Sequence, residues 1–203
     1  MKLKTICTAF AILALATSLA KGQGAKKSSA IDLVTRECST CHGPRGISAT
    51  TTFPNLAGQP AEYLKSQLIA FRDRSRADPH AQAYMWGMAA QLTDAATAEI
   101  GEYFAAQPAA PGKPAGAAEV AAGKKIYEEG IAAQHVAACQ SCHGKNAEGN
   151  KTFPRLSGQH RDYLERQMEA FATNLRVNAS MHENSKNLRA LQISQVAAFL
   201  SAQ

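Results

Sequence analysis

The 203-residue sequence has few of the patterns that mark β-sheets, membrane spans or nucleic-acid binding surfaces. No segment shows sustained alternation of apolar and polar residues between hairpin turns, so a sheet is not expected. After the amino terminus, no apolar run approaches the roughly 20 residues that a spanning helix needs. Basic residues are interspersed with acidic ones and form no stripe with aromatics, which argues against a nucleic-acid partner. These absences favour an all-α fold.

The amino terminus has the pattern of a secretory signal peptide. Lys2 and Lys4 precede a short apolar run, and small residues surround Ala20. We expect cleavage after Ala20, which assigns residues 1–20 to the signal and the mature protein to the periplasm. Removing the signal reduces the formal charge of +6 by the two lysines, to +4. An uncleaved signal that acts as an anchor, with peripheral membrane association, is the alternative.

The rest of the sequence consists of two similar halves. FPNLAGQPAEYLKSQLIAF, residues 53–71, returns as FPRLSGQHRDYLERQMEAF, residues 153–171. After Tyr63 and Tyr163 the identical positions are spaced i, i+1, i+4, i+7 and i+8, as on one face of a helix. That face is expected to be buried, so its polar members need partners. The predicted domains are residues 30–107 and 119–203, joined by a Pro/Gly/Ala-rich, semi-rigid linker at residues 108–118.

Each half carries a C-x-x-C-H motif upstream of the repeated phrase, and this motif is a c-type haem attachment signature. Cysteines three positions apart on a helical turn present both thiols to one side. There they can add to the two vinyl groups of one porphyrin, and the adjoining histidine can bind the iron. The sequence therefore predicts two haems c per chain. The residues concerned are Cys38, Cys41 and His42 in the first half, and Cys139, Cys142 and His143 in the second.

Two other uses of the cysteine pairs fit the sequence less well. A disulfide or thioredoxin-like redox pair is disfavoured by the histidine in both copies and by the absence of a βαβ pattern. A Cys₄ zinc site shared by the two pairs is disfavoured because structural zinc pairs usually belong to one small module. One haem for each half is the better interpretation.

A second axial ligand decides between electron transfer and catalysis. A thioether closes the iron and favours its reduced state, whereas an open position can bind peroxide or a gas. Met85 and Met181 stand at the same offset, seven residues before the leucine near the start of each closing helix. They are therefore the predicted ligands, with Met88 as the competitor in the first half and His182 in the second.

Taken together, these features resemble cytochrome c4, a dihaem class I cytochrome c. The motifs CxxCHG and FPxLxGQxxxYLxxQ, and then a methionine before a closing helix, occur twice around the Pro-rich linker. The resemblance implies two tandem class I cytochrome c domains, each enclosing one covalently attached haem with His/Met coordination. It also implies that the carbonyls of Pro54 and Pro154 accept a hydrogen bond from the ligand histidine. Arg76 and Arg176 match an arginine that could meet a haem propionate, with solvated arginines as the alternative.

One departure concerns the opening helix of each half. The family often has a glycine there that lets this helix cross the closing helix closely. Gly123 can serve in the second half, but the first half, with IDLVTREC, offers no glycine. The first interhelical contact is therefore the less certain expectation.

Three functions are compatible with this sequence. The first is a monomeric carrier that takes electrons from a cytochrome bc complex or a dehydrogenase to an acceptor such as a terminal oxidase. The second is the dihaem subunit of an oxidoreductase such as a flavocytochrome c sulfide dehydrogenase. The third is a dihaem peroxidase, which a short chain with a methionine offered to each iron disfavours. The leading expectation is electron transfer without substrate chemistry, so the protein is not expected to be an enzyme.

Overall fold

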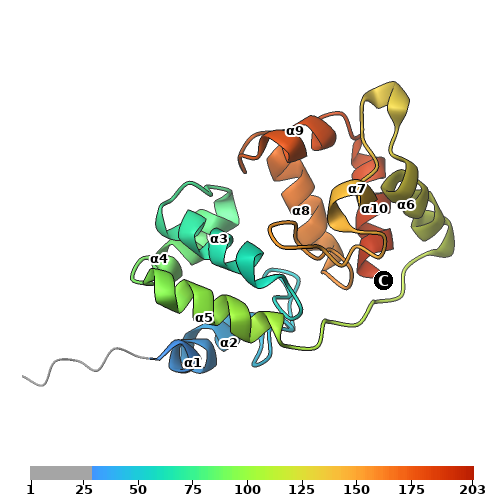
Figure 1. Cartoon of the computed structure of the whole chain (residues 1–203). Helices are drawn as coiled ribbons and strands as arrows, with labels where there is room; N and C mark the ends of the chain where they lie inside the picture. Colours follow the sequence, from blue (N-terminus) through green and yellow to red (C-terminus); the bar gives the residue numbers. More distant parts are fainter. Residues whose placement is uncertain (1–28) are drawn as a thin grey trace, which may run out of the picture.

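The computed structural model describes residues 29–203 as two helical domains joined by a segment without regular structure (Figure 1). The predicted signal peptide lies outside the described residues. Residues 29–203 contain two isolated β-bridges and no β-strand, so the all-α prediction is confirmed. None of the helices in this range is long and apolar enough to cross a membrane.

The two domains repeat one order of elements. In the first domain these are α1 (Ala30–Leu33), the π-helical turn η1 (Val34–Cys38), α2 (Ser39–His42), α3 (Ala61–Arg72), the π-helical turn η2 (Ala81–Met85), α4 (Trp86–Ala89) and α5 (Asp94–Ala105). In the second they are α6 (Ala117–Glu129), the 3₁₀ turn η3 (Ala132–Gln134), α7 (Gln140–His143), α8 (Arg161–Ala172), α9 (Ala179–Ser185) and α10 (Ala190–Ser201). Each domain thus has an opening helix, a short motif helix, the helix of the repeated phrase and a closing helix.

In both domains a glycine turn directly precedes the helix of the repeated phrase. Gly58 and Gly158 have φ angles of 69° and 71°, in the left-handed region that glycine adopts without steric cost. Their amides donate to the carbonyls of Phe104 and Leu200, at 2.9 and 3.0 Å. Both acceptors lie in the last turn of a closing helix, where carbonyls have no partner within the helix. The turn therefore ties the start of α3 to the end of α5, and the start of α8 to the end of α10.

Apolar residues of the opening, phrase and closing helices form one core in each domain. The first contains Ala30, Val34, Leu64, Ile100 and Phe104. The second contains Ile126, Tyr127, Ala147, Leu164, Val196, Ala197, Phe199 and Leu200. On the predicted inner face of the phrase helix, Leu64, Phe71, Leu164, Ala170 and Phe171 are buried, as expected, whereas Ala70 is half-buried.

The opening and closing helices of the second domain cross closely at Gly123. A Cβ atom built at this position would overlap the carbonyl oxygen of Gln195 in α10. The first domain has no glycine in its opening segment, and Ala30 and Val34 there pack with Ile100 and Phe104 instead. Small or β-branched side chains thus replace the glycine contact in the first domain.

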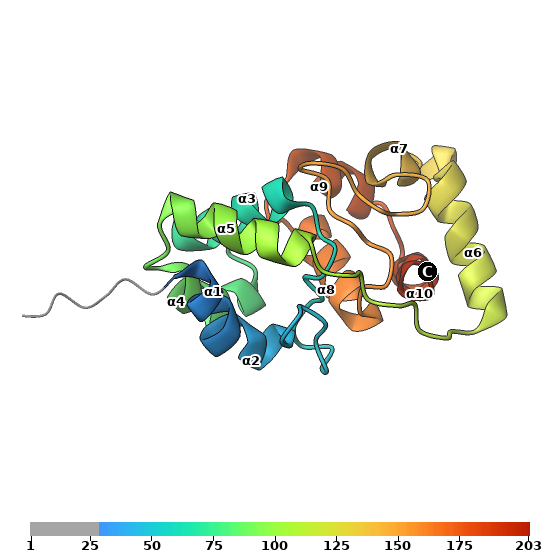
Figure 2. The same ribbon diagram turned by 60° about the horizontal axis from the view of Figure 1, so that its bottom comes forward.

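The linker between the domains is packed against both of them. A Cβ on Gly58 would come within 2.9 Å of the Cβ of Ala109, and one on Gly158 would overlap the carbonyl oxygen of Ala110. The Lys113 amide donates to the carbonyl of Ser201 at 2.8 Å. Figure 2 shows the chain running from α5 along both domains to α6. Helix α6 begins at Ala117, so the last two residues of the predicted linker are helical, a difference common at helix ends.

Replacing Gly123 by valine should destabilise the second domain, because the added side chain meets the backbone of α10 and forces the two helices apart. We expect the free energy of unfolding to fall by about 3 kcal/mol, the upper end of typical overpacking costs. Denaturant unfolding of the haem-loaded protein measures this. Gly116→Ala is the control, since a Cβ at Gly116 meets no atom within 4 Å. Equal stability of the two variants would contradict the close crossing.

Candidate functional site

Both C-x-x-C-H motifs lie on helical turns that face one cavity. All four cysteines of residues 29–203 line this cavity, and none of them forms a disulfide. Burial raises the pKa of Cys38, and it raises the pKa of Cys139 to about 11. Both groups are therefore thiols rather than thiolates at neutral pH. This disfavours a thioredoxin-like redox pair, which depends on a lowered pKa.

The histidine of each motif is buried and oriented by a proline carbonyl. Nδ1 of His42 lies 2.9 Å from the carbonyl oxygen of Pro54, and Nδ1 of His143 lies 3.0 Å from that of Pro154. Because a carbonyl only accepts, Nδ1 must carry the proton and Nε2 the free lone pair. Burial lowers the pKa of both imidazoles, although the bond to the proline opposes this. Each ring is therefore neutral at pH 7, the form that can bind a metal.

A single cavity of about 850 Å³ extends through both domains. Its walls contain apolar side chains of the phrase helices, such as Leu64, Leu68, Phe71, Leu164, Met168 and Phe171. A c-type haem is held in an apolar space by two thiols, an imidazole nitrogen and a thioether. The residues that line this cavity therefore fit one haem in each domain. No three His, Cys, Asp or Glu side chains gather into a metal site anywhere in the described range, so the cysteine pairs do not meet as a joint zinc site.

The candidates for the second axial ligand differ in their surroundings. Met85 packs beside Phe71 in a small apolar cluster, whereas Met88 is 45% exposed, although both line the cavity. Met181 also lines the cavity, and His182 is not among its lining residues. Nδ1 of His182 lies 2.9 Å from the carbonyl oxygen of Phe171. The geometry therefore favours Met85 and Met181.

One candidate escaped the sequence analysis. His80 lines the cavity, and its Nδ1 is buried with no hydrogen-bond partner. The matching position in the second half is Ser180, so the sequence offered no repeated pattern that would have singled out this histidine. It is the competitor of Met85 that only the structure reveals.

Known proteins match this chain over nearly all of the described range. The sequence profile of the family described as Cytochrome c matches residues 30–106 and again residues 120–203. Cytochrome c-552 of Acidithiobacillus ferridurans is 36% identical over 197 residues, which cover 95% of this chain and 84% of that protein. Cytochrome c4 of Thiocapsa roseopersicina is 36% identical over 170 residues, covering 80% and 85%. A solved cytochrome c4 of Acidithiobacillus ferrooxidans has a TM-score of 0.78 at 37% identity, covering 82% of this chain and 98% of that one.

The chain belongs to the cytochrome c4 family. It therefore has two cytochrome c domains and two covalently bound haems c. A further relative is named as the electron acceptor of a thiosulfate dehydrogenase. This protein of Stutzerimonas stutzeri is 30% identical over 171 residues, covering 82% of this chain and 77% of its own length.

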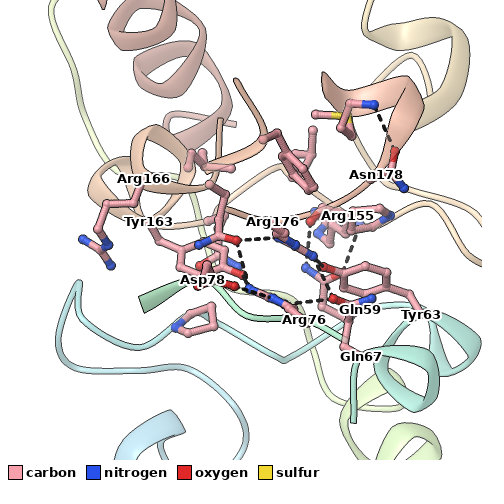
Figure 3. A pocket seen from close by; sticks show the side chains of 18 of the residues that line it. Gln59, Tyr63, Gln67, Arg76, Asp78, Arg155, Tyr163, Arg166, Arg176 and Asn178 are labelled. Carbon is pink, nitrogen blue, oxygen red and sulfur yellow. Dashed lines mark hydrogen bonds and ion pairs between the residues drawn. The ribbon is translucent and has the colours of Figure 1, made fainter. Parts of the chain in front are cut away.

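Arg76 and Arg176 of this cytochrome lie buried between the two domains, and neither is solvated (Figure 3). Each guanidinium lies over the phenylalanine that ends its own phrase, 4.7 Å from the ring of Phe71 and 4.6 Å from that of Phe171. Each also donates to the glutamine of its own domain and to the glutamine and tyrosine of the other domain. We call this set the arginine cluster, and it consists of Arg76, Arg176, Tyr63, Tyr163, Gln67 and Gln167.

The arginine cluster contains more positive than negative charge. Nε of Arg76 donates to the carboxylate of Asp78 at 2.9 Å, and the two side chains are 9% and 3% exposed. The hydrogen-bond acceptors of Arg176 are all neutral. Two buried guanidiniums thus share one carboxylate, and the negative propionates of a haem would balance the remaining charge. The cluster fits such a group, and direct propionate contacts of the two arginines stay a prediction.

Two further glutamines of the repeated phrase join the domains by a reciprocal exchange. Gln59 accepts from the amide of Arg155 at 3.0 Å and donates to its carbonyl at 2.7 Å. Gln159 does the same with Asn55, at 2.8 and 2.9 Å. The repeated phrase predicts that its buried polar residues need partners, but nothing in the sequence indicates that those partners belong to the other domain.

Replacing Gln159 by alanine should weaken the contact between the domains. The amide and carbonyl of Asn55, a residue 5% exposed, would lose their partner in the protein. We expect a loss of about 1–3 kcal/mol in the free energy of unfolding, the cost of buried unsatisfied groups. Calorimetry of the haem-loaded protein tests this against the exposed Gln91→Ala control. A Gln159→Ala variant as stable as the control would show that the exchange contributes little.

Proposed function

We propose that this protein is a periplasmic dihaem carrier of single electrons, without substrate chemistry of its own. The observation that carries the proposal is the donor set of each domain: two thiols, one neutral imidazole and one thioether around a shared apolar cavity. A haem iron with both axial positions filled supplies a one-electron couple and leaves no place for a substrate. We assign cytochrome bc complexes or dehydrogenases as donors and a terminal oxidase as an acceptor.

The chain's own residues would hold each haem rigidly. Cys38 and Cys41, with their counterparts Cys139 and Cys142, would form the thioether links. Pro54 holds the ring of His42 by the Nδ1 hydrogen bond, which leaves the Nε2 lone pair free and would raise its basicity as a ligand of a haem iron. The apolar walls limit water, and with it the reorganisation that accompanies a change of charge.

For the second axial ligands we propose Met85 and Met181. Their support is the shared register in the two halves, the position of both on the cavity wall, the exposure of Met88, and the bond of His182 to a backbone carbonyl. Thioether ligation raises the potential and closes the iron to small molecules. That ligation agrees with a carrier and disfavours a peroxidase.

Replacing Met85 by alanine should lower the potential of the first haem and open its iron to added imidazole or carbon monoxide. A drop on the order of 0.1–0.3 V is expected, within the about 0.8 V that axial ligation spans. Absorption spectra and a potentiometric titration measure both effects. Met88→Ala should change neither the potential nor the access of added ligands. In the second domain, Met181→Ala should show both effects and His182→Ala should show neither.

Other outcomes of this comparison would reassign the ligand. A change in Met88→Ala that equals the one expected for Met85→Ala would move the ligand to Met88. A low-spin, closed iron in Met85→Ala that opens only when His80 is also replaced would assign the site to that histidine. An effect of His182→Ala in place of Met181→Ala would contradict the proposal for the second domain.

A second candidate function is that of a dedicated electron acceptor for one dehydrogenase. This function is favoured by the relative that is named as the electron acceptor of a thiosulfate dehydrogenase. It also corresponds to the wider possibility of a dihaem oxidoreductase subunit, as in flavocytochrome c sulfide dehydrogenase. Since the donor set is the same, only the partners distinguish this function from the first.

Electron exchange with defined partners tests the proposed function. The haem-loaded protein, isolated from the periplasmic fraction as a monomer, should be oxidised by oxidase-containing membranes far faster than it autoxidises. Oxidised protein should be reduced by a thiosulfate dehydrogenase only if the second candidate is right. Reduction by that enzyme without oxidation by membranes would replace the first candidate by the second. Catalytic turnover of peroxide would overturn both.

A further inference from the structure

A buried charged position beside the arginine cluster differs between the two halves. Position 78 is an aspartate that is 2% exposed and bonded to Arg76, whereas the matching position 178 is an asparagine. Asn178 is exposed, and its side chain accepts from the amide of Met181 at 2.9 Å, where it caps α9. Figure 3 shows Asp78 directed towards Arg76 and Asn178 bonded away from Arg176. The pseudo-symmetric cluster therefore has a carboxylate on the first domain's side alone.

Asp78 is charged in the folded protein. Burial opposes ionisation of the carboxyl group, but the Arg76 guanidinium, with a smaller contribution from Arg176, outweighs burial and lowers the pKa of Asp78. Burial likewise opposes the charge of Arg76, and Tyr163, Tyr63 and Asp78 together raise the pKa of that guanidinium. At neutral pH the first domain thus holds a compensated ion pair, while Arg176 has neutral acceptors.

This charge difference would act on the iron, because ferric iron carries one more positive charge than ferrous iron. A nearby carboxylate stabilises the ferric state. Asp78 lines the shared cavity and lies in the segment between α3 and η2, the turn that ends at Met85. The carboxylate thus belongs to the first domain's side of the cavity, where it would lower the reduction potential of that domain's haem.

We propose that Asp78 sets the direction of electron transfer inside the molecule. Asp78 does so by holding the haem of the first domain at a lower reduction potential than the haem of the second domain. This proposal rests on the two-haem carrier function proposed above. With both haems bound, one electron would pass from the iron of the first domain, which would go from ferrous to ferric, to the iron of the second, which would go from ferric to ferrous. Donors would deliver electrons to the first domain, and acceptors would take them from the second.

The size of the effect follows from the burial of the ion pair. Solvent screening is weak where side chains are 9% and 3% exposed. A unit charge in partly buried surroundings near a redox centre changes the equilibrium by about tenfold. For a one-electron couple a tenfold change in the equilibrium constant corresponds to about 59 mV.

The test is a redox titration of the haem-loaded Asp78→Asn variant, followed by NMR so that the two haems are resolved. Each haem would be assigned by its NMR contacts to cavity-lining side chains of its own domain, such as Tyr84 in the first and Met168 in the second. The substitution keeps the shape of the side chain and removes its charge, so the equilibrium constant for transfer to the second domain should fall about tenfold. Asp73→Asn is the control, because it removes the same charge from a side chain that is 55% exposed, and it should leave that constant unchanged.

Two further variants complete the test. Asp78→Glu keeps the charge and should retain the wild-type difference between the potentials. Asn178→Asp adds a carboxylate to the second domain. Because Asn178 lines the cavity and Asp73 does not, this carboxylate should lower the potential of the second haem. Because the position is exposed, the equilibrium constant should change by less than tenfold. This variant decides the question if Asp78→Asn does not bind both haems.

Equal effects of Asp78→Asn and Asp73→Asn would overturn the proposal, as would an Asn178→Asp variant with unchanged potentials. Neither result would affect the carrier function, provided that the wild-type protein still titrates in two reversible one-electron steps. Failure of the wild-type protein to do so would overturn the function itself.

Discussion

The hydrogen bond from the motif histidine to the proline carbonyl links the two sequence elements that each domain repeats. The cysteines and the histidine are adjacent in sequence, but the wall of the cavity comes from the phrase that follows. The bond between Nδ1 of His42 and Pro54, with its copy between His143 and Pro154, sets where the phrase lies relative to the motif. Because it also fixes the tautomer, the same contact that positions the wall leaves Nε2 free for the iron.

The repeated phrase contributes both to the interior of its own domain and to the contact with the other domain. Its leucines and terminal phenylalanine pack into the core or line the cavity, whereas its glutamines, its tyrosine and the arginine beyond it reach into the other domain. A contact with approximate twofold symmetry requires the same residue types from both partners. This gives a physical reason for the repeated polar residues, which a haem wall alone would not need. It also makes a difference such as Asp78 against Asn178 consequential, because it leaves a buried charge without a counterpart in the other domain.

The linker contributes to the same arrangement. Its prolines keep it extended, and the two phrase glycines leave room for it to pass over both domains. The linker therefore limits how the domains can move relative to each other. A fixed arrangement suits electron transfer between two sites, since the transfer depends on their separation and on the charges between them.

The sequence by itself determined the all-α class, the two-domain repeat, the haem attachment motifs and the family. These depend on short spacings, such as three residues between cysteines or the helical period of the phrase, and such spacings have local physical causes. It also predicted Met85 and Met181 through their register, an assignment that the exposure of Met88 supports and that remains to be tested.

Only the tertiary structure decided which polar residues meet across the domain boundary. The bond between Gln159 and Asn55 joins residues 104 positions apart, and that between Arg76 and Gln167 joins residues 91 apart. No local pattern specifies such pairs, because they depend on how two finished domains pack. The burial of Asp78 and the place of His80 on the cavity wall follow from the same packing, so they could not be predicted from the sequence.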